Sequence, residues 1–135
     1  MGPNDAQIVR VFSREPGGKI ADSTLNPQKD GEIVLEAEAG RTLHGQEGSY
    51  RVSLVVRDID DGTAIPVVGS GVVQGHFLTA GEGWTDFPGV FEFTLSSAVL
   101  SQHAGHIAQA YGSVKYGSTE PGATFAVSPP FLILP

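Results

Sequence analysis

Cysteine is absent from the 135 residues of this chain, and tryptophan and methionine occur once each. Without cysteine there are no disulfide bonds and no thiolate chemistry. Positive charge is also scarce, because 8 Lys and Arg face 15 Asp and Glu, which gives a net charge of −7. A chain this acidic is poorly suited to neutralising phosphates, so nucleic acid and anionic membrane surfaces are not expected partners.

Long apolar runs are missing as well. No segment approaches the length of about 20 residues that a membrane-spanning helix needs. The N-terminal sequence MGPNDAQIVRVFS has no charged region followed by an apolar stretch, so no signal peptide is visible. These absences leave the compartment undecided, and we expect a soluble protein that is cytoplasmic or part of a processed or assembled particle.

Glycine and proline are abundant, with 18 and 9 residues, and 40% of the chain is hydrophobic. This composition is typical of many short strands joined by turns, and the length suits one domain over residues 1–135. Charge is spread unevenly, because residues 62–135 carry only Glu82, Asp86, Glu92, Lys115 and Glu120. Exposed strands normally use charge to prevent association, so we expect another subunit to cover part of this half.

Several segments alternate between apolar and polar residues with the period of a β-strand. Strands are predicted over 6–13, 32–39, 50–59 and 90–95, with a short edge strand near 19–21. In the third of these, the residues expected to face inward are Tyr50, Val52, Leu54 and Val56. The Asp-Gly turn signal at 60–63 predicts a hairpin, and Pro66 predicts an edge position. Seven to nine short strands predict an all-β antiparallel sandwich, with a small closed barrel as the alternative.

Residues 96–105, SSAVLSQHAG, predict a short helix near 97–104, capped by Ser96 or Ser97 and ended by Gly105. From His106 the period becomes two, which predicts a strand. His103 and His106 therefore lie on either side of the helix end and need not face the same way. A metal site would need a further ligand from another histidine or a distant carboxylate, and we assign neither a metal nor a cofactor here.

The stretch VFEFTLSSAVLSQHAGHIAQAYGSVKYG (90–117) thus predicts a strand, a short helical corner with a glycine, and a long strand. This order resembles the E strand, E–F corner and F strand of immunoglobulin-like and fibronectin type III-like sandwiches. The closing TFAVSPPFLIL is similar to their last strand. The resemblance covers the last third of the chain and implies the fold without a function. Ile107 and Gln109 stand where an antibody-type domain would have tyrosine and cysteine, so a generic sandwich is expected.

The loop GHFLTAGEGWTDFPG (75–89) concentrates four large rings among glycines, and we take them as the candidate binding residues: His76, Phe77, Trp84 and Phe87. Aromatic anchors of this kind are common at binding hot spots. The alternative is that Trp84 and Phe87 plug one end of the sandwich, because a lone tryptophan in a small domain is usually well buried.

Two groups of acidic residues are weaker candidates for a metal-binding or catalytic site. Asp58, Asp60 and Asp61 beside Gly62 match only part of a calcium loop, and a solvated hairpin turn is the expected alternative. Glu36 and Glu38 share a strand face, which suits acid–base chemistry but equally suits the solvent-exposed face of an amphipathic strand. We assign no catalytic residue.

The sequence therefore favours a non-catalytic protein-interaction or assembly module, whose partner is another protein or a second copy of the chain. One alternative is a small barrel that binds or transforms an apolar small molecule in a cavity lined by aromatic residues, namely Tyr50, Tyr111, Tyr116, His76 and Trp84. The second alternative is a structural subunit of a larger assembly.

Overall fold

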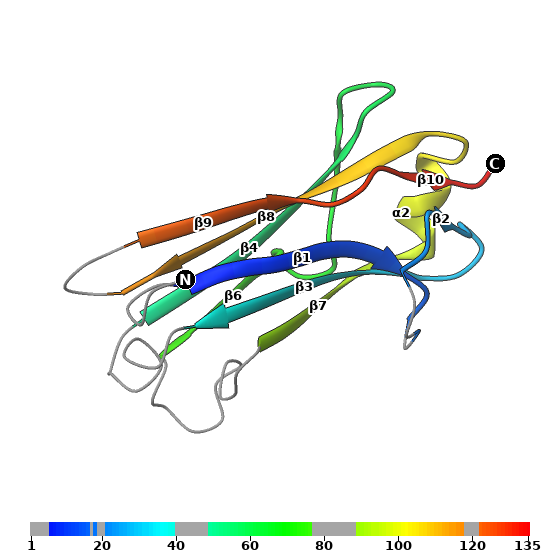
Figure 1. Cartoon of the computed structure of the whole chain (residues 1–135). Helices are drawn as coiled ribbons and strands as arrows, with labels where there is room; N and C mark the ends of the chain where they lie inside the picture. The colour runs from blue at the N-terminus through cyan, green and yellow to red at the C-terminus, as the bar shows by residue number, and fades with distance from the viewer. Residues whose placement is uncertain (1–5, 17, 19–20, 40–48, 77–88, 118–121) are drawn as a thin grey trace.

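The computed structural model describes residues 6–16, 18, 21–39, 49–76, 89–117 and 122–135. In this part of the chain two β-sheets face each other and a short helix lies at one end (Figure 1). The elements in chain order are β1 (Ala6–Arg14), β2 (Thr24–Leu25), β3 (Gly31–Ala39), β4 (Ser49–Asp58), β5 (Ala64–Ile65), β6 (Val72–His76), β7 (Gly89–Leu95), α2 (Ser97–Gln102), β8 (Ile107–Tyr116), β9 (Gly122–Val127) and β10 (Phe131–Ile133).

The predicted all-β sandwich is confirmed, and the described strands form two open sheets instead of the closed barrel that was the alternative. The smaller sheet has the order β1-β3-β7 and is antiparallel throughout. A register shift between Ile8 and Arg10 leaves Val9 as an extra residue in β1. Such a bulge bends the strand locally and increases its twist.

The larger sheet is built around β4 and β8, which pair from Tyr50 opposite Tyr116 to Asp58 opposite Ala108. On the far side of β4 lie β5 and β6, and on the far side of β8 lie β9 and β10. The short β2 joins β10 in parallel. This arrangement leaves β5 at an edge of the sheet, directly before Pro66, as the proline predicted.

Pro129 and Pro130 lie between β9 and β10 and interrupt the final strand, because proline cannot donate to the ladder. Both pieces nevertheless pair with β8, and only β10 gains β2 as a second neighbour. Among the described strands, β9 before the break therefore lies at an edge of the sheet, whereas β10 after it lies between β8 and β2. The edge strand predicted near residue 20 falls largely outside the described residues, and the strand observed in this region is β2.

The helix α2 begins as the sequence predicts. The Ser96 side chain accepts a hydrogen bond from the Val99 N–H at 3.3 Å, which caps one of the free N–H groups of the first turn. The Asp30 Oδ1 atom accepts a second one from the Ser97 N–H at 2.9 Å. Leu100 points into the core and is fully buried. The helix ends at Gln102 with His103 as its C-cap, and Gly105, with a φ of +82°, lets the chain turn into β8.

The core lies between the sheets and follows the predicted alternation. The inward residues of β4 and β8 are buried and contact those of β3. They are Tyr50, Val52, Leu54 and Val56 in β4, Ala108, Ala110, Val114 and Tyr116 in β8, and Ile33, Leu35 and Ala37 in β3. In the part of the chain that the structure describes, no helix is long and apolar enough to span a membrane.

Candidate functional site

The predicted binding loop cannot be placed, because Phe77, Trp84 and Phe87 lie outside the described residues. His76 ends β6, but its side chain is also outside them. Whether these rings form a docking surface therefore stays a prediction. The described residues instead bring out two other features, which are the outward face of the larger sheet and a cluster of histidine and aspartate beside α2.

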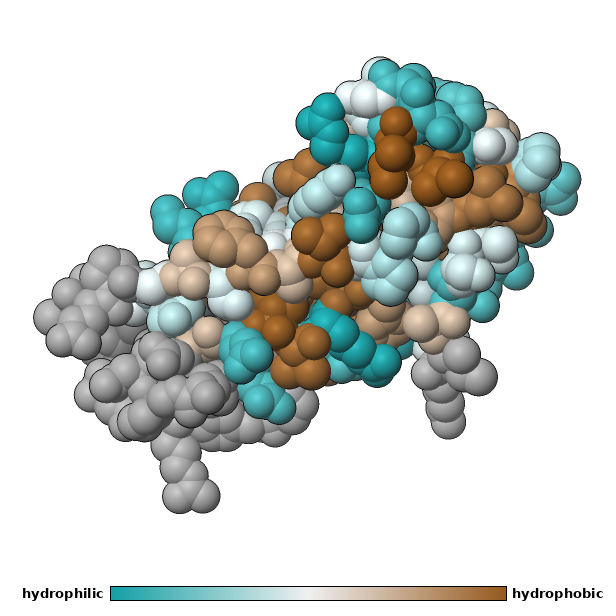
Figure 2. Space-filling view, turned by 45° about the horizontal axis from the view of Figure 1, so that its top comes forward, coloured by the Kyte–Doolittle hydropathy of each residue, from teal (hydrophilic) through white to brown (hydrophobic). Residues whose placement is uncertain are grey.

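The outward face of the larger sheet exposes large apolar side chains. Val55 of β4, Tyr111 of β8 and Val127 of β9 lie directly opposite one another across the three strands. Their exposed fractions are 52%, 38% and 52%, and Phe125 on β9 reaches 76%. Figure 2 shows exposed apolar groups of this kind lying among polar ones. A set of exposed apolar side chains on neighbouring strands is characteristic of an interaction surface.

No carboxylate accompanies these residues at the outward positions of β4, β8 and β9. The charged side chains there are all basic, namely Arg51, Arg57 and Lys115. Arg51 and Lys115 stand directly opposite each other on neighbouring strands. Like charges in that register destabilise a sheet, so this pair is a local cost to the isolated subunit.

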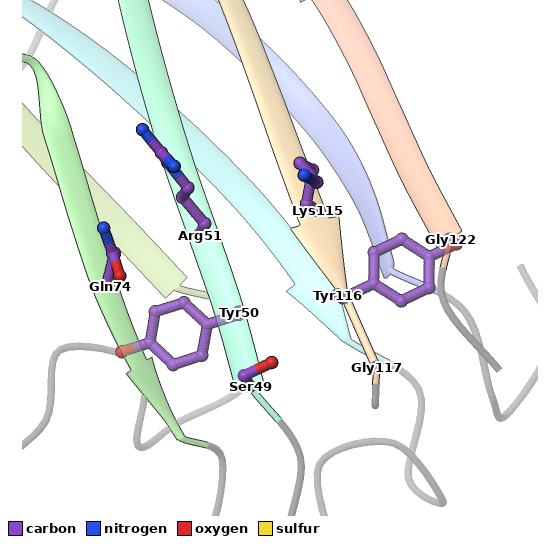
Figure 3. A pocket seen from close by; sticks show the side chains of 8 residues that line it. All are labelled: Ser49, Tyr50, Arg51, Gln74, Lys115, Tyr116, Gly117 and Gly122. Carbon is purple, nitrogen blue, oxygen red and sulfur yellow. The ribbon is translucent and has the colours of Figure 1, made fainter. Parts of the chain in front are cut away.

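A pocket of about 340 Å³ opens at this end of the sheet and is lined by both basic residues. Figure 3 shows Arg51, Lys115 and Gln74 projecting from neighbouring strands to the same side, while the rings of Tyr50 and Tyr116 lead away from them. Two cations and an amide at the wall of an open pocket suit a carboxylate from a partner. This surface is thus apolar in its middle and basic at its ends.

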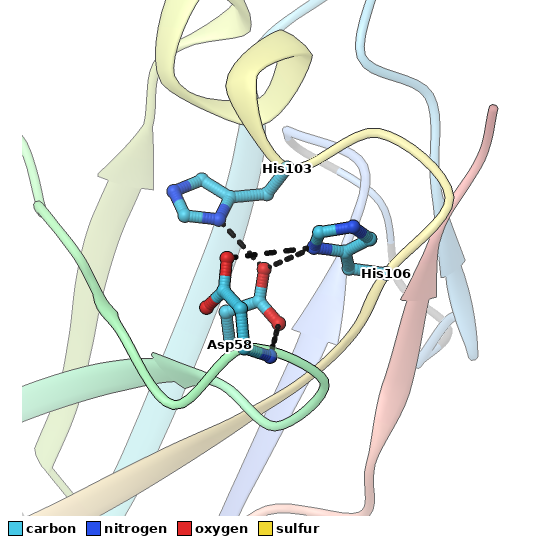
Figure 4. A group of neighbouring side chains, drawn as sticks. Asp58, His103 and His106 are labelled. Atoms are coloured by element: carbon cyan, nitrogen blue, oxygen red, sulfur yellow. Dashed lines mark hydrogen bonds and ion pairs between the residues drawn. The ribbon is translucent and has the colours of Figure 1, made fainter.

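The second feature is a buried carboxylate held by two histidines. Asp58, at the end of β4, has no exposed surface. Its Oδ2 atom lies 2.7 Å from His103 Nδ1 and 2.5 Å from His106 Nδ1, and Figure 4 shows the two rings approaching it from either side. Its Oδ1 atom accepts hydrogen bonds from the N–H groups of Asp60 and Asp61, at 2.9 and 3.1 Å. The carboxylate therefore has four partners, as a buried charge requires.

These contacts shift the ionisation of both partners. Burial alone raises the pKa of Asp58, but the hydrogen bonds from His106, His103 and the Asp61 N–H outweigh burial and lower the pKa to about 2. The hydrogen bond to Asp58 in turn raises the pKa of His106 above its ordinary value. Because Asp58 is ionised at neutral pH, both ring nitrogens that face it must be donors.

The expectation that the two histidines need not face the same way is wrong, because their Nδ1 atoms meet at one oxygen. The sequence carried a signal for this. Asp58 continues the inward series of residues 50–56, and His106 directly precedes β8, two residues before its first inward residue Ala108. A buried charge needs a partner, so an aspartate at an inward position and a histidine just before the neighbouring strand should have been paired.

The other acidic residues considered for calcium binding or acid–base chemistry form local contacts or lie exposed. Asp60 Oδ2 accepts the Ile107 N–H, and Asp61 Oδ1 accepts both the N–H and the hydroxyl of Thr63, which accounts for the hairpin turn without calcium. The Asp61 pKa is lowered, chiefly by the Thr63 hydroxyl. Glu36 forms an ion pair with Arg10 at 2.8 Å, and Glu38 lies exposed on the same outward face.

The three tyrosines named for the barrel alternative do not line one cavity. Tyr50 and Tyr116 lie inward and are buried, whereas Tyr111 lies on the outward face and is 38% exposed. The pocket between the ends of β4 and β8 includes only the first two of them. Their separation follows from register, because Tyr111 occupies an odd position in a strand whose even positions face the core.

Comparison with known proteins supports the fold. No protein family model matches the chain, and no curated protein matches it. Among solved structures, the chain is similar to AggA, the major subunit of aggregative adherence fimbriae type I from Escherichia coli. The match has a TM-score of 0.52 at 8% sequence identity and covers 98% of this chain and 97% of that one. At this identity the similarity establishes a shared sandwich-like all-β fold.

Proposed function

We propose that this chain is a non-catalytic structural subunit that assembles with copies of itself through the outward face of its larger sheet. The observation that carries the proposal is the composition of that face. In a chain with 15 acidic and 8 basic residues, the outward positions of β4, β8 and β9 hold three basic side chains and no acidic one. Between them lie the exposed apolar residues Val55, Tyr111, Phe125 and Val127.

Charge indicates which surface of a second copy fits there. Two larger-sheet faces repel each other, because each is basic. The outward positions of the smaller sheet carry four carboxylates against two arginines, namely Glu32, Glu36, Glu38 and Glu92 against Arg10 and Arg14. Exposed apolar groups are present there too, since Val9 and Val90 are 51% and 49% exposed. The complementary partner of the larger-sheet face is therefore the smaller-sheet face of the next copy.

A contact between two different faces leaves the pair of copies with one unused face of each kind, the smaller-sheet face on one copy and the larger-sheet face on the other. Such a head-to-tail contact builds an open chain of subunits unless its rotation closes a ring. Burial of the apolar row supplies the main attraction. The basic ends of the face orient the partner, because complementary charge fixes register and suppresses wrong contacts.

Two further observations support this proposal. The similar solved structure is described as the major subunit of aggregative adherence fimbriae, which is a structural subunit of an assembly. The order β7, α2, β8 also keeps the predicted resemblance to immunoglobulin-like and fibronectin type III-like sandwiches, and we retain that assignment as part of the proposal. Immunoglobulin-like and fibronectin type III-like domains are sandwiches that can present their faces and edges to partners.

Light scattering behind a sizing column tests the proposal with matched variants. The pair Phe125→Ser and Val127→Thr removes apolar area from the outward face, whereas Val68→Thr changes a residue that is 60% exposed outside that face. We expect the wild type and the Val68→Thr protein to form the same concentration-dependent oligomers. The double variant should elute mainly as a monomer. Equal oligomerisation of all three proteins contradicts the assignment of this face.

A further inference from the structure

We propose that Asp58, Asp61, His103 and His106 form a binding site for one zinc ion, which fastens the β4–β5 hairpin to the corner between α2 and β8. The four side chains come from two segments that lie far apart in the sequence. Each offers one ligand atom, and the four atoms all lie within 4.8 Å of one another.

The spacing of these atoms is close to what zinc requires. With bonds of about 2.0–2.1 Å, the ligand atoms of a tetrahedral zinc site lie about 3.3 Å from one another. His103 Nδ1 and His106 Nδ1 lie 2.7 and 2.5 Å from Asp58 Oδ2, and Asp61 Oδ2 lies 3.8 Å from His106 Nδ1. Small rotations of side chains that already converge therefore bring the set to tetrahedral distances.

The orientation of the rings points to a shared cation. The two imidazoles are nearly perpendicular, with an angle of 71° and ring centroids 6.4 Å apart, and both direct Nδ1 at one carboxylate oxygen. In the metal-free protein each of these contacts needs its own proton, and both protons point at the same atom. One divalent ion replaces both protons and keeps the same three groups together.

The backbone holds the site in place before any ion binds. Asp58 N–H donates to the Thr63 carbonyl at 2.8 Å, and the Gly62 N–H donates back to the Asp58 carbonyl at 2.9 Å. On the other side, the His106 N–H donates to the His103 carbonyl at 3.1 Å. Four ligands on anchored backbone match a structural zinc site, and a preformed site loses little entropy on binding.

The donor set selects the ion. Imidazole nitrogen with carboxylate oxygen suits zinc and neighbouring transition metals, whereas calcium and magnesium prefer sites made only of oxygen. His103 is only 8% exposed and Asp58 is fully buried, so bulk water cannot readily replace these ligands. The partly exposed ring of His106 leaves a route by which the ion enters.

Isothermal titration of zinc into chelator-treated full-length protein tests the site, together with native mass spectrometry. We expect one zinc per chain with a dissociation constant at or below about 1 µM, and no binding of calcium or magnesium. His106→Gln should weaken zinc binding at least tenfold. The matched control replaces the chain's other two histidines, His44 and His76, with glutamine and should keep wild-type affinity.

Two outcomes overturn the inference. One is the absence of stoichiometric zinc binding by the folded wild type. The other is loss of binding in the His44 and His76 variant while His106→Gln still binds. If His106→Gln does not fold, imidazole NMR signals of the wild type decide the question, because one equivalent of zinc must then shift the resonances of His103 and His106 and leave the other two unchanged.

Discussion

His103 Nδ1 lies 2.7 Å from the Oδ2 atom of Asp58, and the two residues are 45 positions apart in the chain. The contact joins the end of β4 to the corner that follows α2. Asp58 is completely buried, so this hydrogen bond lies in surroundings where a carboxylate without partners is costly. The contact ties the corner after α2 to the larger sheet. We therefore expect the free energy of unfolding to be sensitive to substitution of Asp58.

Asp58→Asn should destabilise the metal-free protein by about 3 kcal/mol, because the amide cannot accept four hydrogen bonds and leaves buried N–H donors unpaired. Urea denaturation in the presence of a chelator measures the free energy of unfolding. Glu38→Gln, on an exposed residue of β3, serves as the control and should change it by less than about 0.5 kcal/mol. Equal effects from the two substitutions contradict the role given to Asp58.

Asp58 and His106 set the pH range in which the metal-free protein is most stable. The pKa of Asp58 is lowered from 3.8 to about 2, so its contribution is present above pH 3.8 and is lost as the pH falls toward 2. The pKa of His106 is raised from 6.5, so its contribution is present below pH 6.5 and is lost as the pH rises through the folded-state value. Stability should therefore be highest between these limits.

Thermal unfolding midpoints measured across this pH range, with chelator present, test the prediction. His106→Gln should flatten the decline above pH 6.5 and retain the decline at acidic pH, because glutamine does not titrate. Wild-type and variant profiles that stay parallel above pH 6.5 contradict the assignment.

Gly112 should be intolerant of any side chain. It faces the core from β8, and a Cβ atom there would lie 2.6 Å from Leu35 Cδ1 and 3.2 Å from Val11 Cγ2. Gly112→Ala forces these side chains apart, and we expect a loss of about 1–3 kcal/mol in unfolding free energy. Ser113→Ala, the next residue on the outward face, is the control and should be nearly neutral. A neutral Gly112→Ala indicates looser packing between the sheets than described.

Self-association should weaken as salt is added, because the basic ends of the larger-sheet face contribute by attraction between exposed charges. Lys115→Glu removes one cation and places a carboxylate opposite Arg51, which improves that cross-strand pair while reversing part of the face. We expect this variant to be at least as stable as the wild type in urea but to form fewer oligomers in the sizing experiment. Unchanged oligomers argue against the charge-complementary contact.

Much of the fold was predictable, because burial in a sandwich imposes a period of two on each strand. The inward residues of β4 and β8, the Ser96 cap and the break at Pro129 all follow from local chemistry. The outward row of Val55, Tyr111 and Val127 was not predictable in the same way. It depends on register between strands that are distant in sequence, and local pattern does not specify that register.

The histidine and aspartate cluster was missed for a related reason. Spacing within residues 103–106 indicated only an incidental pair, and the partner that brings the two rings together lies on β4. The available clue was the alternation of β4, which places Asp58 on the same inward side as Val56 and so puts a charge in the core. The aromatic loop at 75–89 lies largely outside the described residues, so the docking prediction made for it still stands untested.

Sedimentation velocity of the wild-type chain over a series of concentrations tests the central claim most directly. Head-to-tail association predicts a series of species that grows steadily with concentration, shrinks when salt is added, and does not stop at the dimer. A single monomeric species at every concentration, or a dimer that saturates, contradicts the account of a self-assembling subunit.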